Sequence, residues 1–188
     1  WMHAAFLNID HEKMSKSLGN FFTLREVLNK LDAVQGGETV RYFLLRGHYR
    51  SEINYSWDML EDARQSLLGF YIALKETPAA EVKLDWANAT AQKFRLAMED
   101  DFDTPAAFAV LHELRREVNR TRSGETAGLL RALGATLGFF QDSPAAFVQG
   151  AANTAQLDVD ALVSERNAAK QRQDFTRADA IRKQLDAA

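Results

Sequence analysis

The sequence SWDMLEDARQSLLGFYIALKETP, residues 56–78, has the clearest regular pattern in the chain. Apolar residues recur there at the spacing of one helix face, namely at Leu60, Ala63, Leu67, Tyr71 and Leu74. Ser56 or Asp58 can cap the start of a helix, and Thr77-Pro78 ends the pattern because proline cannot continue one. We therefore expect a long amphipathic helix over this stretch.

Similar helical signals lie on both sides of it. Residues suited to a helix start, each followed by apolar residues at helical spacing, are Thr23, Thr39, Thr104-Pro105, Thr126 and Ser143-Pro144. Gly36-Gly37 is expected to break the first of these helices, and Gly47 to end the second. A further helix is expected at about 85–99. Amphipathic helices joined by short capped loops predict a mostly α fold, an antiparallel helical bundle.

Composition limits the classes of function. The chain has 188 residues, 46% of them hydrophobic, which is enough for a core of one or two domains. It has no cysteine, so disulfides and thiolate metal sites are excluded within it. The net charge of -3 gives no overall attraction to nucleic acid, and any such role must use local basic patches. We expect a soluble, cytoplasmic protein with no membrane partner, and a monomer.

The first twenty residues differ from the rest. Residues 1–10 form an apolar, strand-like stretch without an initiator methionine, which predicts a C-terminal piece of a longer protein. Residues 11–20 have no apolar period and predict a loop. Within it, Lys13-Met14-Ser15-Lys16-Ser17 places two ammonium groups and two hydroxyls around one methionine. Such groups suit a polyphosphate, because cations brought to a departing pyrophosphate stabilise its charge in the transition state.

Residues 13–17 match in all five places the second signature of class I aminoacyl-tRNA synthetases, the KMSKS loop. A solvated basic loop is the ordinary alternative for a short segment of this composition. The segments around the loop resemble the cysteinyl-tRNA synthetase family in particular. These segments are Trp1-Met2-His3, Glu12–Phe22, His48–Ser51 with Asn54-Tyr55-Ser56, Asp100–Pro105, and Ala168–Asp179. The segment Glu38–Leu45 matches one that is shared loosely with the methionyl and leucyl enzymes.

The resemblance implies the end of a class I catalytic domain followed by an anticodon-binding helical bundle. It divides the chain into residues 1–54, with the KMSKS loop and stem-contact region, and residues 55–150, the bundle. A linker at 151–157 and the start of a C-terminal anticodon-recognition domain at 158–188 would follow. The segment 34–37 looks like a short insertion.

The implied activity is ATP-dependent ligation of cysteine to tRNA(Cys) through cysteinyl-adenylate, with Mg-bound ATP, cysteine and tRNA(Cys) as partners. The class I HIGH-type strand and the family's zinc ligands are absent from this sequence. The four histidines lack ligand spacing, so no metal site is expected within the chain. Zinc would be held in the intact enzyme by residues outside it, and the chain alone is expected to be inactive.

By this resemblance Lys13 and Lys16 are the expected catalytic residues, and the whole loop, Lys13, Met14, Ser15, Lys16 and Ser17, would contact ATP. Met14 is interpreted as an anchor that packs the loop. Ser15 and Ser17 can donate hydrogen bonds or simply cap. Two residues elsewhere have structural interpretations, Arg41 as an ion-pair residue and Asp103 as a helix-start residue.

Basic residues supply the candidate tRNA contacts. Near the acceptor end these are His48 and Arg50, and on the bundle they are Arg115, Arg116 and Arg120, extended by Arg122. In the last segment, Lys170, Arg172, Phe175 and Asp179 combine cations, an aromatic face and a carboxylate, the set that reads unstacked bases. The alternatives are a solvated charged face for the arginines and an ordinary amphipathic hairpin with Phe175 in its core.

Two other functions stay open from the sequence. A relative that joins cysteine to a different acceptor, such as an amino sugar, would use the same activation step, but is not expected to keep helices directed at an anticodon. A free-standing tRNA-binding helical module would need no phosphate-binding lysines, and the loop at residues 13–17 argues against it.

Overall fold

The computed structural model describes residues 1–9, 12–15 and 17–150, together with residues 166, 167, 177, 179 and 181. It divides into two compact units, residues 1–150 and residues 151–188. In the second unit, the five described residues are helical and Ile181 is buried. The predicted linker and most of the predicted C-terminal hairpin lie outside the described residues.

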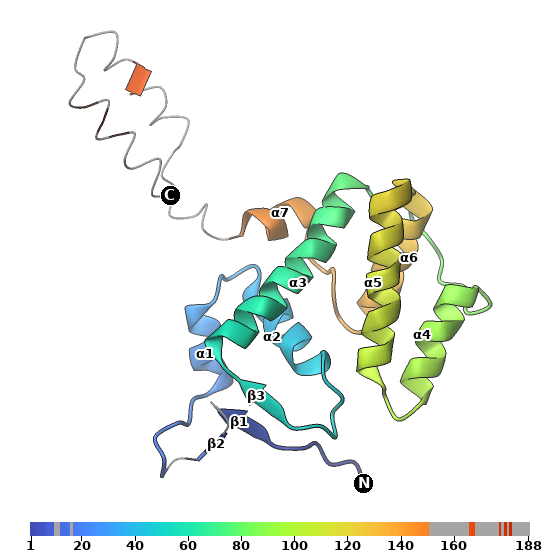
Figure 1. Cartoon of the computed structure of the whole chain (residues 1–188). Helices are drawn as coiled ribbons and strands as arrows, with labels where there is room; N and C mark the ends of the chain where they lie inside the picture. The colour runs from blue at the N-terminus through green and yellow to red at the C-terminus, as the bar shows by residue number, and fades with distance from the viewer. Residues whose placement is uncertain are drawn as a thin grey trace. The chain divides into compact units, whose positions relative to one another are not determined.

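Three short strands form a sheet at one end of the first unit (Figure 1). The strands are β1 (Leu7–Ile9), β2 (Glu12–Lys13) and β3 (Ile53–Tyr55), in the order β2-β1-β3. β1 pairs antiparallel with β2, with Asn8 opposite Lys13, and parallel with β3, with Leu7 opposite Ile53. The strand expected within residues 1–10 is thus present, and β3 is its parallel neighbour.

The first three helices are α1 (Leu24–Lys30), α2 (Gly36–Leu45) and α3 (Trp57–Glu76). Thr23 caps α1 in a capping box with Glu26, and Ser56 caps α3 by accepting from the backbone N–H of Met59. Both starts agree with the sequence prediction. Ser56, rather than Asp58, is the cap of the long helix.

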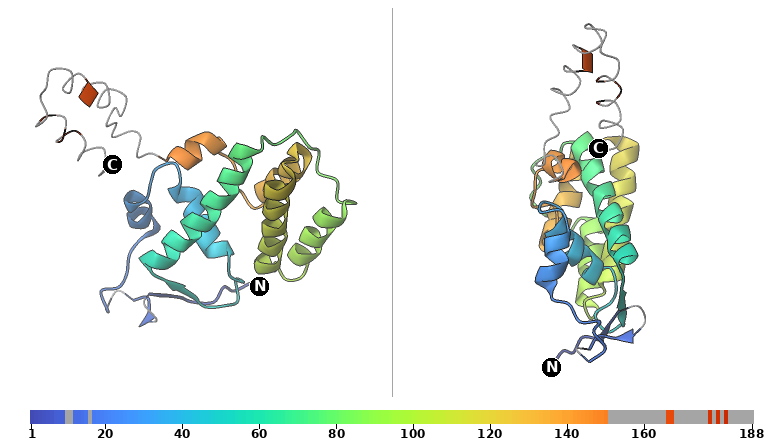
Figure 2. Two further views of the ribbon diagram at one scale, coloured as in Figure 1. Left: turned by 45° about the horizontal axis from the view of Figure 1, so that its top comes forward. Right: turned by 90° about the vertical axis from the view of Figure 1, so that its left-hand side faces the viewer.

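Four further helices follow: α4 (Ala89–Glu99), α5 (Thr104–Thr121), α6 (Gly124–Thr136) and α7 (Pro144–Gln149). Ser143 caps α7, and Asp103 caps α5, which confirms its interpretation as a helix-start residue. Gly150 ends α7 with a positive φ of 68°, a conformation that glycine adopts without steric cost. α4, α5 and α6 pack side by side, and α3 packs against α2 and α7 (Figures 1 and 2).

Several predicted helix boundaries are wrong by a few residues. Thr39 does not cap α2, because the helix already begins at Gly36 and Thr39 is fully buried inside it. Gly47 does not end α2 in a left-handed conformation, since the C-cap is Arg46 with right-handed angles. The other corrections are that Ser123 rather than Thr126 caps α6, that Asp103 rather than Thr104 caps α5, and that α4 starts after Asn88.

A cluster of aromatic rings fills the core around α3. Tyr71 and Phe147 stack face to face with ring centroids 3.6 Å apart, which attaches α7 to α3. Phe70 and Tyr71 also contact Phe140, in the segment after α6. Because such rings bury large apolar areas, they supply much of the energy that holds the helices to α3.

The carboxylate of Glu38 is buried in this core, with only 7% of the residue exposed. It accepts hydrogen bonds from the Tyr71 hydroxyl at 2.9 Å and from the backbone N–H groups of Phe140 at 3.1 Å and Gln141 at 3.0 Å. Burial raises the pKa of Tyr71 well above its ordinary value, so the hydroxyl stays a donor. One side chain thus joins α2, α3 and the segment between α6 and α7.

Arg41, interpreted from the sequence as an ion-pair residue, has a different partner. Its guanidinium donates to the backbone carbonyl of Gly138, in the same segment that Glu38 binds. This carbonyl takes the place of the expected carboxylate, while the structural role remains. Among the described residues, no helix is both long and apolar enough to cross a membrane.

We predict that Glu38→Ala lowers the free energy of unfolding by about 3 kcal/mol, because it leaves two backbone donors and one hydroxyl buried without an acceptor. Urea unfolding of the 188-residue chain measures this. The exposed Glu81 provides the control, and Glu81→Ala is expected to change the free energy by less than about 0.5 kcal/mol. Equal unfolding midpoints for the two variants would contradict the structural role of Glu38.

Candidate functional site

The loop at residues 13–17 begins on β2 and is held at the edge of the sheet. Lys13 is exposed, pairs with Asn8 of β1, and has its ammonium 4.4 Å from the centroid of the Phe6 ring. Backbone pairing therefore fixes where Lys13 starts, while its long side chain can reach outward. Lys16, the other lysine of the loop, lies outside the described residues.

Asn20 closes the loop from its far end. Its side-chain oxygen accepts from the backbone N–H of Ser15 at 2.8 Å, and its amide donates to the carbonyl of Lys13 at 3.3 Å. The Ser15 hydroxyl lies 3.0 Å from that of Ser17 and accepts from the backbone N–H of Leu18. Gly19, with a positive φ of 68°, allows the chain to turn back. Both hydroxyls thus contribute to the shape of the loop.

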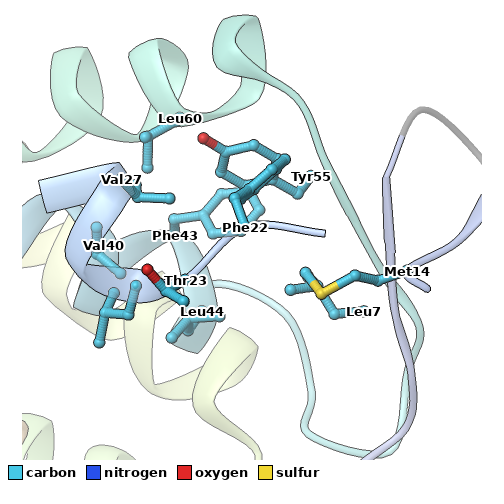
Figure 3. Close-up of a pocket in the computed structure, with 11 residues that line it drawn as sticks. Leu7, Met14, Phe22, Thr23, Val27, Val40, Phe43, Leu44, Tyr55 and Leu60 are labelled. Carbon is cyan, nitrogen blue, oxygen red and sulfur yellow. The ribbon is translucent and has the colours of Figure 1, made fainter. Parts of the chain in front are cut away.

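Met14 turns toward the core, as expected for an anchor. It is half-buried and packs against the core together with Leu7. The two side chains line one part of an apolar cavity of about 200 Å³, and Phe22, Phe43 and Tyr55 line another (Figure 3). The remaining lining residues come mainly from α1, α2 and the start of α3, namely Thr23, Leu24, Val27, Val40, Leu44 and Leu60. Because Met14 has a flexible side chain and free space beside it, it can stay packed while the loop shifts.

The candidate residues His48 and Arg50 contact Asp101, in the turn between α4 and α5. Arg50 forms a bidentate pair with the Asp101 carboxylate, with Nε 2.7 Å from Oδ2 and Nη2 3.1 Å from Oδ1. The hydroxyl of Tyr49 donates to Oδ1 at 2.7 Å, and Nε2 of His48 lies 3.1 Å from the Asp101 carbonyl oxygen. We call these four residues, His48, Tyr49, Arg50 and Asp101, the Asp101 clasp.

Hydrogen bonding also sets the electrostatics of the clasp. The hydroxyl of Tyr49, and then the guanidinium of Arg50, lower the pKa of Asp101 below its ordinary value of 3.8. Nδ1 of His48 accepts from the backbone N–H of Arg50, so Nε2 is the nitrogen that carries a proton and donates to Asp101. The clasp is therefore formed with Asp101 charged.

The arginines of α5 do not share one surface. Arg115 is half-buried and faces α3, with its guanidinium 5.0 Å from the centroid of the Phe70 ring and 3.4 Å from the Ser66 carbonyl. Arg116 and Arg120 are exposed, and Arg120 forms a 2.6 Å ion pair with Glu117. Arg122, just after α5, pairs with Glu76 at 2.6 Å. The accessible cations on this helix are thus Arg116 and Arg120.

The C-terminal candidates are placed only in part. Asp179 is helical and exposed, whereas Lys170, Arg172 and Phe175 lie outside the described residues. Within the described part of the chain, no three histidine or acidic side chains come together as metal ligands. His112 has a structural environment, 3.1 Å from the Tyr42 hydroxyl, and burial lowers its pKa. The described residues therefore do not fit the zinc ion that the resemblance implies.

Two family models match separate parts of the chain. Residues 1–65 match the model of the class I (C) tRNA synthetase catalytic domain, and residues 93–141 match the DALR domain. The predicted fold class is confirmed, because the end of a class I catalytic domain precedes a helical domain of this type.

The particular relatives are cysteine–tRNA ligases. The chain is 51% identical over 98% of its length to the cysteine–tRNA ligase of Polaromonas naphthalenivorans, and covers 39% of that protein. It is 52% identical over 98% of its length to those of Laribacter hongkongensis and Delftia acidovorans, covering 40% of each. The resemblance predicted from the sequence is thus confirmed, and the chain spans about 40% of the length of these relatives.

Sequence reasoning missed three residues that organise the site: Asn20, Asp101 and the buried Glu38. All three lie in segments that resemble known synthetases. They were missed because the residues that they contact lie elsewhere in the chain. The available signal was the position of Asp101 two residues before a helix cap, where an aspartate tolerates a left-handed turn.

We predict that Tyr49→Phe raises the pKa of Asp101 back toward 3.8, because the hydroxyl is its strongest hydrogen-bond donor. A carboxyl-detected NMR titration of wild type and variant measures this shift in the pKa of Asp101.

The lowered pKa also makes the stability depend on pH. Since the folded-state pKa of Asp101 lies below the ordinary value, the stabilisation from its charged form is complete above about pH 5 and is lost as the pH falls through the lowered pKa. A titration that is identical in wild type and variant would rule out this hydrogen bond.

Proposed function

We propose that the intact protein containing this chain ligates cysteine to tRNA(Cys), by forming cysteinyl-adenylate from cysteine and ATP and then transferring the cysteinyl group to the terminal adenosine. The main support is the identity of about 50% to cysteine–tRNA ligases along nearly the whole chain, including the signature loop. Adenylate formation breaks the bond between the α- and β-phosphates of ATP and releases pyrophosphate.

In this proposal the KMSKS loop stabilises the charge that builds on the departing pyrophosphate. Lys13 and Lys16 supply ammonium groups, and Ser15 and Ser17 supply neutral donors. The exposed position of Lys13 on β2, and the closure of the loop by Asn20, support this role. Met14 keeps the loop packed against the apolar cavity during its approach to Mg-bound ATP. Zinc, which in this family binds the thiolate of cysteine, would be held by residues outside the chain.

We propose a division of labour that follows the boundaries expected from the sequence. Residues 1–54 would act near the ATP and the acceptor end, and residues 55–150 would carry tRNA along the helical bundle. Residues 151–157 would link the bundle to an anticodon-reading segment at 158–188, in which Lys170, Arg172, Phe175 and Asp179 contact tRNA. The match of residues 93–141 to the DALR domain supports the role of the bundle.

On the described surface, the proposed phosphate contacts are the exposed Arg116 and Arg120, with His48 and Arg50 nearer the acceptor end. Arg115 belongs to the sequence-based set, but its contacts with Ser66 and Phe70 give it a share in holding α5 against α3. Its contribution to tRNA binding would therefore be smaller than that of Arg116.

Lys16→Ala in the intact protein is expected to reduce the rate of tRNA-independent ATP–pyrophosphate exchange by about 100-fold or more, because one cationic donor to the transition state is lost. Lys75→Ala, at an exposed lysine of α3, is the control and should exchange at the wild-type rate. An undiminished rate for Lys16→Ala would refute the role of the loop. The 188-residue chain alone is expected to show no exchange.

Arg116→Ala is expected to weaken tRNA(Cys) binding and to reduce the dependence of log K on log salt by about one counterion, because an exposed phosphate contact is removed. Arg115→Ala is expected to lower the thermal midpoint instead and to leave the salt slope nearly unchanged. Filter binding across a salt series, with calorimetric unfolding of the same variants, measures both effects. The reverse pattern would show that Arg115 is the tRNA contact.

A further inference from the structure

We propose that Asp101 is a positioning residue for transfer of the cysteinyl group to tRNA, an inference that rests on the proposed function. Through the Asp101 clasp it sets the orientation of α5 relative to the paired strands β1 and β2, of which β2 carries Lys13. Transfer requires the acceptor end of a tRNA bound along the helices to meet the adenylate beside the loop. The clasp is one polar connection between these two regions, and the hydrogen bond from Thr104 to Gly47 is another.

The backbone at Asp101 is held in an unusual conformation. Asp101 and Phe102 are consecutive residues with left-handed φ angles of 52° and 55°, although neither is glycine. Such angles cost free energy and persist only where neighbouring contacts enforce them. The enforcing contacts are close by, since the N–H of Asp103 donates to the carbonyls of Ala97 and Asp100, and the Asp103 side chain caps α5. The turn just before α5 therefore holds the Asp101 carboxylate toward Tyr49 and Arg50.

The carboxylate meets a segment that is about 51 residues away in sequence. Besides the bonds to Tyr49 and Arg50, the Thr104 hydroxyl donates to the carbonyl of Gly47 at 3.2 Å. The contacts come from both the side chain and the backbone of the turn. They therefore fix the angle between the two segments as well as their distance.

From the clasp, backbone hydrogen bonds lead to the loop. The carbonyl of Tyr49 accepts from the N–H of Ala5 at 2.8 Å, and the N–H of Ile53 donates to the carbonyl of Phe6 at 3.1 Å. The next residues form the paired strands β3 and β1, and β1 pairs with β2, which carries Lys13. No flexible side chain intervenes after the clasp. In the other direction, Asp101 stands three residues before α5 and its exposed Arg116.

The exposure of the clasp separates a positioning role from a stabilising one. The side chains of Asp101 and Arg50 are 44% and 63% exposed. Ion pairs with this exposure contribute little to folding stability. A small error in orientation, in contrast, strongly reduces the rate of a reaction between two bound groups. Loss of the carboxylate should therefore affect the tRNA-dependent step much more than folding or the activation of cysteine.

The test uses the intact protein with Asp101→Ala, Asp101→Asn and, as a matched control, Asp100→Ala at the neighbouring exposed aspartate. Asp101→Ala is expected to keep ATP–pyrophosphate exchange within twofold of wild type and to lower the single-turnover rate of transfer about tenfold, with a change of less than about threefold in KM for tRNA. Asp101→Asn keeps one acceptor oxygen and should fall between Asp101→Ala and wild type. Asp100→Ala should behave as wild type.

A wild-type transfer rate for Asp101→Ala would overturn the positioning role and leave the proposed function intact. An equal loss of exchange and transfer, or an unfolding midpoint lowered enough to explain the loss, would also overturn it. Absence of exchange in the wild-type protein would instead refute the proposed function.

The double variant Arg50→Ala/Asp101→Ala should transfer no more slowly than the slower of the two single variants. Multiplicative losses in the transfer rate would show that the two residues do not act as one unit.

Discussion

The buried carboxylate of Glu38 is the constraint on which the first unit depends. A carboxyl group that leaves water needs hydrogen-bond partners, and Glu38 obtains them from α3 and from the segment after α6. Because these donors are rigid backbone amides and a buried hydroxyl, α2 has one favoured position against α3. Aromatic rings pack around the same arrangement, because Phe140 contacts both Phe70 and Tyr71 of α3.

The candidate site lies next to the packed unit formed by α2, α3 and the segment after α6. α2 leads into the segment with His48 and Arg50, which continues into β3, and β3 leads into α3. The strand β3 of the small sheet is therefore joined along the chain to both α2 and α3. The KMSKS loop is then attached by strand pairing, by Met14 in the apolar cavity, and by Asn20. Among the described residues of the loop, the Asn20 side chain and the Ser15 hydroxyl make the hydrogen bonds that shape it.

The sequence predicted the features that depend on local interactions. Thr23, Ser56 and Ser143 begin helices because their side chains accept from backbone N–H groups three residues later, a relation visible in the sequence. Thr39 was misread because α2 begins three residues earlier, just after a turn in which the Asp32 side chain accepts from the backbone N–H groups of Val34 and Gln35. The clasp could not be predicted, since Arg50 and Asp101 are 51 residues apart and each looks like an ordinary surface charge. The similarity to cysteine–tRNA ligases was predictable because the loop motif consists of consecutive residues, 13–17, and can be recognised without a structure.

The sequence separation of the Glu38 contacts matters during synthesis on the ribosome. Phe140 is made 102 residues after Glu38, which at about 5–20 residues per second is an interval of about 5–20 s. Until then the nascent α2 lacks the amides that satisfy its carboxylate, and its apolar face has no complete partner. α2 therefore gains all of its Glu38 contacts only after Phe140 and Gln141 have been synthesised.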